Sequence, residues 1–174
     1  RALRRRDVSG SVAVIDLDHF KMLNDRFGHA AGDAFLHCTA ARLQATLTAD
    51  IVVARFGGDE FALFIPGSVD RARPLLDRLL AVIRQPVELE AETISVTASI
   101  GLAVLPLSMG LDQGLSAADL AMYVAKCEGR DRVLEFSEET AGVVTARREL
   151  AKTVVSLQER NRELQQQVQL DALT

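Results

Sequence analysis

The stretch from Arg55 to Ile65 constrains the fold of this chain most, because two apolar runs flank the sequence Gly57-Gly58-Asp59-Glu60. Apolar β-forming residues on both sides of a glycine pair predict a tight β-hairpin, since glycine adopts the positive φ angles of such turns. Without a Cβ, the two glycines also allow a phosphate group to approach the backbone closely. Adjacent carboxylates at a hairpin tip suit hard cations such as Mg²⁺, although a solvated acidic turn is the simpler alternative.

The composition indicates a globular protein with one domain and an additional segment. The chain has 174 residues, of which 48% are hydrophobic and 25% charged, and its net charge is −4. These values give no sign of a nucleic-acid or membrane-binding surface. No apolar run approaches the roughly 20 residues of a membrane span, and no signal peptide is recognised. We therefore expect a cytoplasmic protein, or the cytoplasmic portion of a larger one, with no membrane segment in this fragment and no nucleic-acid polymer as its partner.

Residues 12–18 predict the first buried strand. The run is apolar up to Leu17 except for Asp16, and Asp18 follows directly. Carboxylates at the end of a buried strand can hold a metal at the edge of a sheet. Capping of the next helix is the simpler role for Asp18, whereas Asp16 interrupts an apolar strand and is harder to explain without a ligand.

Two helices are predicted next, over residues 19–27 and 33–47. Gly28 ends the first helix, and Asp33 is the expected N-cap of the second. If the two helices form a hairpin, Asn24 and Asp33 face one another across it. An amide and a carboxylate so placed can read the edge of a purine. The alternative is that both are ordinary residues at helix termini.

The pattern of apolar residues and turn formers predicts the remaining elements. They are strands over 51–56, 61–65, 87–90, 93–105 and 132–136, and helices over 70–84 and 116–126, the second capped by Ser116. This order predicts an α/β (α+β) sandwich with a mostly antiparallel sheet. Lys126 and Arg130, four residues apart at the end of the last helix, can hold phosphate oxygens, and complementing the helix dipole is the simpler alternative.

Four separate segments match one known family in the right order. They are Asp16-Leu17-Asp18-His19-Phe20-Lys21 with Asn24-Asp25; Phe27 to Asp33; Arg55 to Phe61; and Ser99-Ile100-Gly101 with Ala118-Asp119, Tyr123, Ala125, Lys126, Gly129 and Arg130. Through these residues the sequence resembles the GGDEF family, the diguanylate cyclases, over residues 1–137.

The resemblance implies a fold and a reaction. The implied fold is palm-like and ferredoxin-like, with a central, mostly antiparallel five-stranded sheet surrounded by helices. The implied reaction condenses two GTP molecules into cyclic di-GMP and two pyrophosphates, and each of two facing domains holds one GTP. Mg²⁺ or Mn²⁺ is the implied cofactor, because divalent cations neutralise the triphosphate and the developing charge.

The resemblance also implies roles for the acidic residues. Asp16, Asp59 and Glu60 become metal ligands, together with the carbonyl oxygen of Leu17. Asp59 and Glu60 are in addition the catalytic carboxylates, one of which assists deprotonation of the attacking 3′-hydroxyl, and the match does not separate their roles.

The implied substrate contacts extend over the whole domain. Asn24 and Asp33 match the residues that bind guanine, and a carboxylate accepts hydrogen bonds from both N1–H and the exocyclic amine, a donor pair that adenine lacks. Lys126 and Arg130 match the contacts to the terminal phosphates. The remaining members of the implied substrate-binding set are Phe20, Lys21, Gly57 and Gly58.

The sequence departs from the family pattern just before the hairpin. Many members have an Arg-x-x-Asp product-inhibition site there. In this chain Leu47 stands three residues before Asp50, and one extra residue separates Asp50 from Gly57 compared with the usual spacing. We therefore expect no product inhibition at this site.

The ends of the chain suggest an unusual domain organisation. We expect a GGDEF domain over residues 1–137 that lacks the usual N-terminal opening segment, and a coiled-coil helix over residues 138–170. Residues 171–174 read Asp-Ala-Leu-Thr and resemble the start of such an opening segment. A tandem domain and a circularly rearranged domain both explain this order.

A heptad pattern predicts how the chain dimerises. Its positions are Leu150, Val154, Leu157, Asn161, Leu164 and Val168. Leucine at every d position, with valine and one asparagine at a, favours a parallel two-stranded coiled coil. We expect a homodimer through residues 147–170; the alternative is an amphipathic helix folded back on its own domain.

Two further functional hypotheses remain beside an active cyclase. A catalytically silent GGDEF domain would bind GTP or a protein partner as a regulatory module. A palm-type transferase that acts on a polynucleotide is disfavoured by the acidic net charge.

Overall fold

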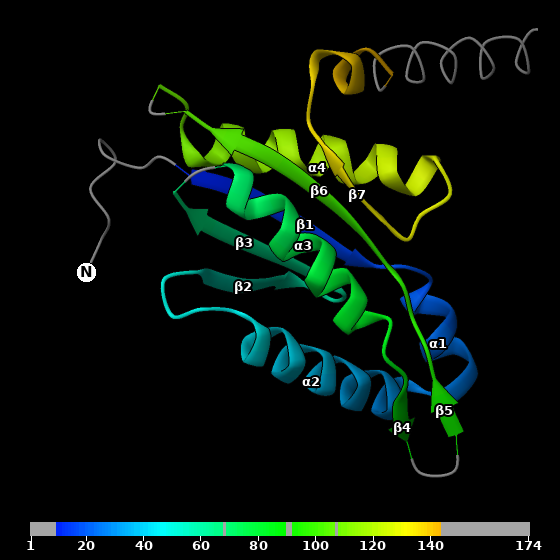
Figure 1. The fold of residues 1–174 in the computed structure, drawn as a ribbon. Helices are drawn as coiled ribbons and strands as arrows, with labels where there is room; N and C mark the ends of the chain where they lie inside the picture. The colour runs from blue at the N-terminus through cyan, green and yellow to red at the C-terminus, as the bar shows by residue number, and fades with distance from the viewer. Residues whose placement is uncertain (1–9, 68, 90–91, 107, 144–174) are drawn as a thin grey trace, which may run out of the picture.

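A five-stranded sheet with the strand order β2-β3-β1-β6-β7 forms the centre of the protein (Figure 1). The structure is a computed structural model that describes residues 10–67, 69–89, 92–106 and 108–143. Along the chain the elements are β1 (Gly10–Leu17), α1 (Phe20–Phe27), α2 (His29–Thr46), β2 (Val52–Gly57), β3 (Glu60–Pro66), α3 (Val69–Ile83), β4 (Val87–Leu89), β5 (Glu92–Ile94), β6 (Ala98–Leu105), α4 (Leu111–Cys127) and β7 (Arg132–Glu135).

Strand β1 lies in the middle of the sheet. It pairs antiparallel with β3 on one side and with β6 on the other. Strand β2 is antiparallel to β3, whereas β7 is parallel to β6. The expected mixed α/β fold with a mostly antiparallel five-stranded sheet is therefore confirmed.

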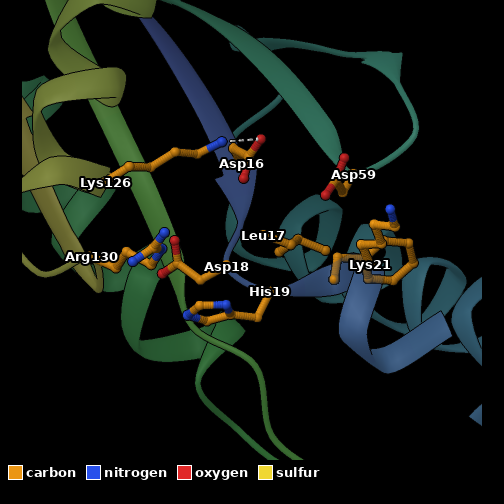
Figure 2. Close-up of a pocket in the computed structure, with 9 residues that line it drawn as sticks. Asp16, Leu17, Asp18, His19, Lys21, Asp59, Lys126 and Arg130 are labelled. Carbon is orange, nitrogen blue, oxygen red and sulfur yellow. Dashed lines mark ion pairs between the residues drawn. The ribbon is translucent and has the colours of Figure 1, made fainter. Parts of the chain in front are cut away.

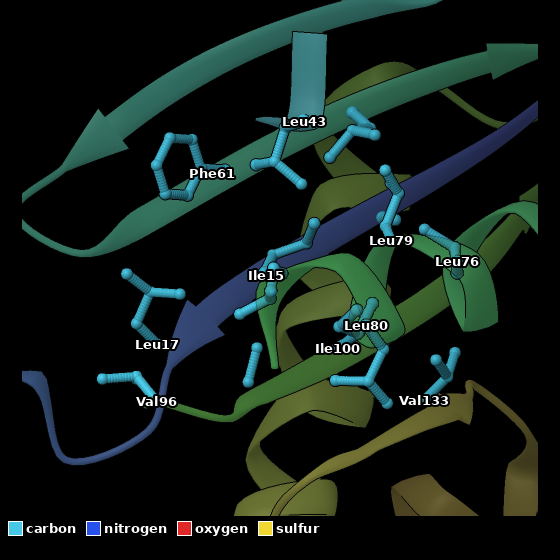
Figure 3. Close-up of a cluster of buried hydrophobic side chains, with 14 of the residues drawn as sticks. Ile15, Leu17, Leu43, Phe61, Leu76, Leu79, Leu80, Val96, Ile100 and Val133 are labelled. Atoms are coloured by element: carbon cyan, nitrogen blue, oxygen red, sulfur yellow. The ribbon is translucent and has the colours of Figure 1, made fainter. Parts of the chain in front are cut away.

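Helices cover both faces of the sheet, which explains why β1 is apolar on both sides. On one face, Ile15 and Leu17 of β1 pack in a cluster with residues of α2 and α3, including Leu43 and Leu76 (Figure 3). On the other face, Val12 of β1 packs with residues of α4. The predicted apolar stripe of α3 is buried as expected, namely Leu75, Leu76, Leu79, Leu80 and Ile83. Of the stripe predicted for α2, Phe35, Leu36 and Leu43 are buried, whereas Ala40 and Leu47 are only partly buried.

Helix α4 packs directly against the backbone of β6 at Gly101, where there is no side chain between them. A Cβ at Gly101 would overlap the backbone carbonyl oxygen of Ala118 and the amide nitrogen of Met122. Side chains of ordinary size at this position would keep the helix further away. Gly101 thus determines the distance between α4 and the sheet, and with it the position of Lys126 in the last turn of the helix.

Three predicted element boundaries are wrong. The single strand over 93–105 is divided, because Glu92–Ile94 pairs with β4 in a separate ribbon while Ala98–Leu105 joins the central sheet. Helix α4 begins at Leu111, so Ser116 lies inside it and donates its hydroxyl to the Asp112 carbonyl oxygen (2.9 Å).

The boundary between the first two helices also differs from the expectation. Gly28 has a φ of 84° and is the only residue between α1 and α2. Because glycine adopts this left-handed conformation without strain, α2 begins at His29. Asp33 is therefore inside the helix and does not cap it.

Residues 138–143 begin a further helix. The predicted coiled coil over 147–170 and the segment 171–174 lie outside the described residues. In the part of the chain that the structure describes, no helix combines the length and the apolar character needed to cross a membrane.

Candidate functional site

Three acidic residues, Asp16, Asp59 and Glu60, lie on paired strands and the adjoining turn at the end of β1. Asp16 is the register partner of Glu60 on β3, and it is 7% exposed. Asp59 sits in the turn that precedes Glu60, and its carbonyl oxygen accepts a hydrogen bond from the Leu17 amide (3.3 Å). The hairpin tip is thus attached to the strand that carries Asp16, and Figure 2 shows Asp16 and Asp59 on the same side of the pocket.

The hairpin turn consists of Gly58 and Asp59. Gly57 already pairs with Glu60, and of the two glycines only Gly58 has a positive φ, of 21°. The predicted tight hairpin is confirmed, but the predicted need for positive φ applies to one glycine. Arg55 stabilises the turn by donating from Nε and Nη2 to the Gly58 carbonyl oxygen at 3.0 and 2.6 Å.

Two basic residues at the end of α4, Lys126 and Arg130, line the site beside the carboxylates. Lys126 lies in the last turn of α4, and its Nζ is 2.7 Å from Oδ2 of Asp16. Arg130 follows in the turn after the helix. Both line a pocket of about 180 Å³ (Figure 2), whose full lining is Asp16, Leu17, Asp18, His19, Phe20, Lys21, Asp59, Lys126 and Arg130.

Asp16 has a pKa that its surroundings raise above the usual value. Burial raises the pKa of Asp16, the ion pair with Lys126 lowers it in part, and the neighbouring charges of Asp59 and Glu60 raise it further. A buried carboxylate with two like charges nearby is stabilised by a cation. In this structure Lys126 supplies that positive charge.

The donor set fits a magnesium ion. Carboxylate oxygens of Asp16 and Asp59 and the Leu17 carbonyl are hard oxygen ligands, which Mg²⁺ prefers. The observation that supports this fit is the burial of the Asp16 carboxylate beside the charges of Asp59 and Glu60, which together raise its pKa. Within the described ranges, however, no three His, Cys, Asp or Glu side chains already converge as a metal cluster.

A second polar position lies between α1 and α2. The side-chain oxygen of Asn24 is buried and finds no hydrogen-bond donor among the described residues. It rests against Gly32, where a Cβ would overlap it. Asp33, the next residue, is exposed at the surface of α2. The structure thus brings Asn24 to the neighbourhood of Asp33, as the predicted helical hairpin requires.

Not all predicted site residues line the same pocket. Phe20 and Lys21 do, and the buried Phe20 ring also packs against Phe35 with centroids 6.4 Å apart. The guanine candidates Asn24 and Asp33 lie outside this pocket, and so do the turn glycines Gly57 and Gly58 and the carboxylate Glu60. The expected substrate contacts therefore extend well beyond the pocket in which the cations and Asp16 meet.

The predicted capping role of Asp18 is wrong. His19 occupies the N-cap of α1, with a φ of 60° and no side-chain hydrogen bond to the helix. The Asp18 carboxylate instead accepts hydrogen bonds from the hydroxyls of Thr97 (2.6 Å) and Ser99 (2.7 Å) and from the Asp131 amide (3.1 Å). Sequence reasoning missed these contacts because they join residues far apart in the chain.

Comparison with known proteins places these features in one family. The family profile described as "Diguanylate cyclase, GGDEF domain" matches residues 1–132. The diguanylate cyclase DgcP of Pseudomonas aeruginosa is 41% identical over 124 residues, which cover 70% of this chain and 18% of DgcP. The cyclic di-GMP phosphodiesterase NbdA of the same organism is 36% identical over 131 residues, or 74% of this chain and 17% of NbdA. The chain thus spans less than a fifth of these two relatives.

The fold comparison agrees with the sequence comparison. A solved structure of PA1120 (TpbB or YfiN) from Pseudomonas aeruginosa, comprising only the GGDEF domain, superimposes with a TM-score of 0.74 and 35% identity. The match covers 79% of this chain and 83% of that one. With the intact sequence from Gly57 to Phe61 at the hairpin and the matched domain around it, this chain belongs to the GGDEF family.

Proposed function

We propose that this domain is a diguanylate cyclase that condenses two GTP molecules into cyclic di-GMP and releases two pyrophosphates. The observation that carries the proposal is that one pocket is lined both by the carboxylates Asp16 and Asp59 and by the basic residues Lys126 and Arg130. Carboxylates suit the cations that accompany a triphosphate, and the two basic residues suit its oxygens. The relative DgcP, a named diguanylate cyclase, supports the assignment.

The pocket at the end of β1 and the polar position between α1 and α2 bind different parts of the nucleotide. The pocket at Lys126 and Arg130 takes the phosphates. The guanine base lies toward α1 and α2, where Asn24 stands near Asp33 and the exposed Asp33 carboxylate accepts the N–H groups of the base. A pocket of about 180 Å³ suits the phosphates alone, which agrees with a base bound outside it.

The metal ligands in this proposal are Asp16, Asp59 and the Leu17 carbonyl, with Glu60 nearby. Mg²⁺ or Mn²⁺ at these oxygens neutralises the triphosphate when it is bound. A bound cation would supply the countercharge of the buried Asp16 carboxylate, and the Lys126 ammonium would then be available for a phosphate oxygen. Asp16 would thus be paired with a positive charge with and without the metal.

The chemistry needs two domains. The 3′-oxygen of one GTP forms a bond to the α-phosphorus of the other, the bond from that phosphorus to the bridging α–β oxygen breaks, and pyrophosphate leaves. Asp59 or Glu60 accepts the proton of the 3′-hydroxyl. The same step with the roles exchanged closes the ring. Since one domain holds one GTP, two domains must face each other.

The coiled coil would bring the two domains together. The heptad from Leu150 to Val168 predicts a parallel homodimer through residues 147–170. Linking two domains converts their encounter into an intramolecular event with a raised effective concentration. This segment lies outside the described residues, so the proposal depends on its sequence pattern.

A silent regulatory domain is the second candidate function. The ion pair between Lys126 and Asp16 occupies both a proposed phosphate contact and a proposed metal ligand. If GTP and Mg²⁺ do not separate this pair, the site binds nucleotide weakly and catalyses nothing. The relative NbdA, a named phosphodiesterase, carries a matching region and makes this candidate worth testing.

Incubation of the purified chain with GTP and Mg²⁺, followed by anion-exchange chromatography, distinguishes the candidates. An active cyclase forms cyclic di-GMP and pyrophosphate in a ratio of one to two, and formation stops when EDTA is added. ATP in place of GTP serves as the matched control. GTP binding by calorimetry without any product would support the silent domain instead.

A further inference from the structure

Asp18 is a buried carboxylate that the proposed reaction does not use. It is 4% exposed, and both of its oxygens are engaged by the protein. Oδ1 accepts from the Ser99 hydroxyl, and Oδ2 accepts from the Thr97 hydroxyl and from the Asp131 amide. Thr97 and Ser99 belong to the β6 region, whereas Asp131 belongs to the turn after α4. The carboxylate thus joins three segments that are distant in sequence.

The position of Asp18 in the sequence suggests a different role. Asp16 and Asp18 are two residues apart at the end of one strand, and such residues point to the same face of a sheet. A pair of carboxylates on one face suggests two metal ligands. The structure disfavours that role, because three protein donors already occupy Asp18, whereas Asp16 has only the Lys126 ammonium as its recorded partner among the described residues.

The turn that Asp18 holds has an uncommon backbone. Arg130 and Asp131 both have positive φ angles, of 63° and 51°. Consecutive non-glycine residues in the left-handed region are rare, and each costs free energy that surrounding contacts must offset. The free turn therefore prefers other conformations, in which the Arg130 side chain leaves in a different direction.

Contacts from two sides offset this cost. Asp18, which directly follows β1, accepts a hydrogen bond from the Asp131 amide. From the end of α3, Arg84 donates to Oδ1 of Asp131 (2.8 Å) and to its carbonyl oxygen (3.1 Å). The Arg84 pair is exposed and contributes little. The hydrogen bond to Asp18 is partly buried and has a charged acceptor, so it contributes more.

We propose that Asp18 is a positioning residue, which holds the turn after α4 so that Arg130 points into the phosphate pocket. This inference rests on the proposed binding of a nucleoside triphosphate at that pocket. Asp18 does not contact the substrate or the metal in this proposal. It acts through the backbone of Asp131 on the adjacent Arg130, and it fixes the distance between Arg130 and the end of α4.

Two substitutions at Asp18 separate positioning from metal binding. Asn keeps the size, and its amide oxygen still accepts from the Asp131 amide and the Thr97 hydroxyl, while its NH₂ group donates to Ser99. Ala removes all three hydrogen bonds. A positioning role therefore predicts that Asp18→Asn is tolerated and Asp18→Ala is not. If Asp18 were a metal ligand, both substitutions would weaken metal binding to a similar extent, because both remove the negative charge.

Calorimetry with two ligands provides the main test on the full chain with Mg²⁺ present. We expect Asp18→Ala to weaken binding of the α,β-methylene analogue of GTP by about tenfold or more, the loss typical of a hydrogen bond to a charged group. Binding of GMP, which lacks the β- and γ-phosphates, should change by less than about twofold. Asp18→Asn should resemble the parent with both ligands. Ser99→Ala, which leaves the contact to Asp131 intact, is the matched control and should also keep the affinity for the analogue.

Hydrogen–deuterium exchange provides a test that needs no nucleotide. Asp18→Ala should speed exchange in peptides that cover residues 128–132, and Asp18→Asn should not. Unchanged exchange in Asp18→Ala, equal losses in the two Asp18 variants, or equal losses for the analogue and GMP would each overturn the inference. A parent that binds the analogue but forms no cyclic di-GMP would refute the proposed cyclase and leave this comparison intact. A parent that binds no analogue would refute both.

Discussion

Nζ of Lys126 lies 2.7 Å from Oδ2 of Asp16, so a proposed phosphate contact neutralises a proposed metal ligand. Burial raises the pKa of Asp16, and a positive charge beside it offsets part of that effect. In the proposed mechanism, a cation at the carboxylate would make Lys126 available for the triphosphate. Binding of metal and binding of phosphate would then be coupled through one ion pair, and each should strengthen the other.

Asp59→Ala is expected to abolish cyclase activity and to leave the fold intact. Asp59 lies in a two-residue turn, is only partly buried, and makes its recorded contact to Leu17 through its backbone carbonyl, which the substitution retains. Product formation from GTP and the thermal unfolding temperature, Tm, measure the two effects. Asp119→Ala, an exposed carboxylate on α4, is the matched control and should keep both. Unchanged activity in Asp59→Ala would contradict the proposed mechanism.

Asp33→Ala is expected to raise the KM for GTP and to reduce the preference for GTP over ATP. Asp33 is exposed near the buried, unpaired oxygen of Asn24, so its loss removes a guanine acceptor without opening the core. Steady-state kinetics with both nucleotides measure the effect. Asp25→Ala, another exposed carboxylate of this hairpin, should leave KM unchanged. If the two variants behave alike, Asp33 does not bind the base.

Sequence patterns predicted the elements that follow a local period. The stripes of α2 and α3 and the hairpin at Gly57 and Gly58 are set by residues close in the chain, so they were predictable. The division of the 93–105 strand was not, because it depends on which strand each half pairs with. Helix α2 begins early because Gly28 alone, with its positive φ, connects it to α1. In the sequence, this glycine looks the same as one that ends a helix before a longer loop.

The site was predicted less completely than the fold. The apolar run that Asp16 interrupts identified it as a buried acid, but its ion pair with Lys126 joins positions more than 100 residues apart. The same holds for Asp18, which was expected to cap a helix and instead binds Asp131. Contacts that tertiary structure creates between distant polar residues have no periodic signal in the sequence. These contacts decide the electrostatics of the pocket.

Gly101→Ala is expected to destabilise the domain by about 1–3 kcal/mol, the usual cost of adding atoms to a packed interior. The new Cβ would overlap the carbonyl oxygen of Ala118, so α4 must move away from β6. Because Lys126 lies at the end of this helix, activity should fall together with Tm. Thermal unfolding and the cyclase assay measure both effects.

Gly110→Ala is the matched control for the Gly101 variant. Gly110 precedes α4 with a φ of −74°, and beyond its chain neighbours a Cβ there would meet no described atom within 4 Å. Its Tm should stay close to that of the parent. If both alanine variants unfold at the parent's temperature, Gly101 does not set the position of α4.

Arg71→Gln is expected to lower Tm at pH 7 and to have a smaller effect at strongly acidic pH. Arg71 donates to both carboxylate oxygens of Asp50 (2.6 and 3.1 Å), and these bonds, with one from Thr48, lower the pKa of Asp50. A carboxyl group whose pKa is lower in the folded state stabilises the fold above its unfolded pKa of about 3.9. That contribution is lost as the pH falls through the folded pKa.

The size of the Arg71 effect should depend on salt. Both partners are nearly half exposed, so the difference in Tm between parent and variant should be small and should decrease in high salt. Arg78→Gln, on the same helix, is the control. A difference in Tm that is constant from pH 7 to acidic pH would show that Arg71 acts through packing and not through Asp50.

Truncation after Glu139 is expected to convert a dimer into a monomer and to reduce cyclase activity at low protein concentration. The removed segment contains the heptad positions from Leu150 to Val168, with Asn161 at an a position. A buried asparagine pairs with its symmetry mate when two strands are parallel and in register, which costs stability and fixes alignment. Light scattering at micromolar concentration measures the oligomeric state.

Activity should recover as the concentration of truncated protein rises, because only the encounter of two domains is impaired. Asn161→Leu in the full chain tests the register separately, and it should keep or strengthen association while allowing other alignments. A truncated protein that stays dimeric and fully active would show that another surface joins the two domains.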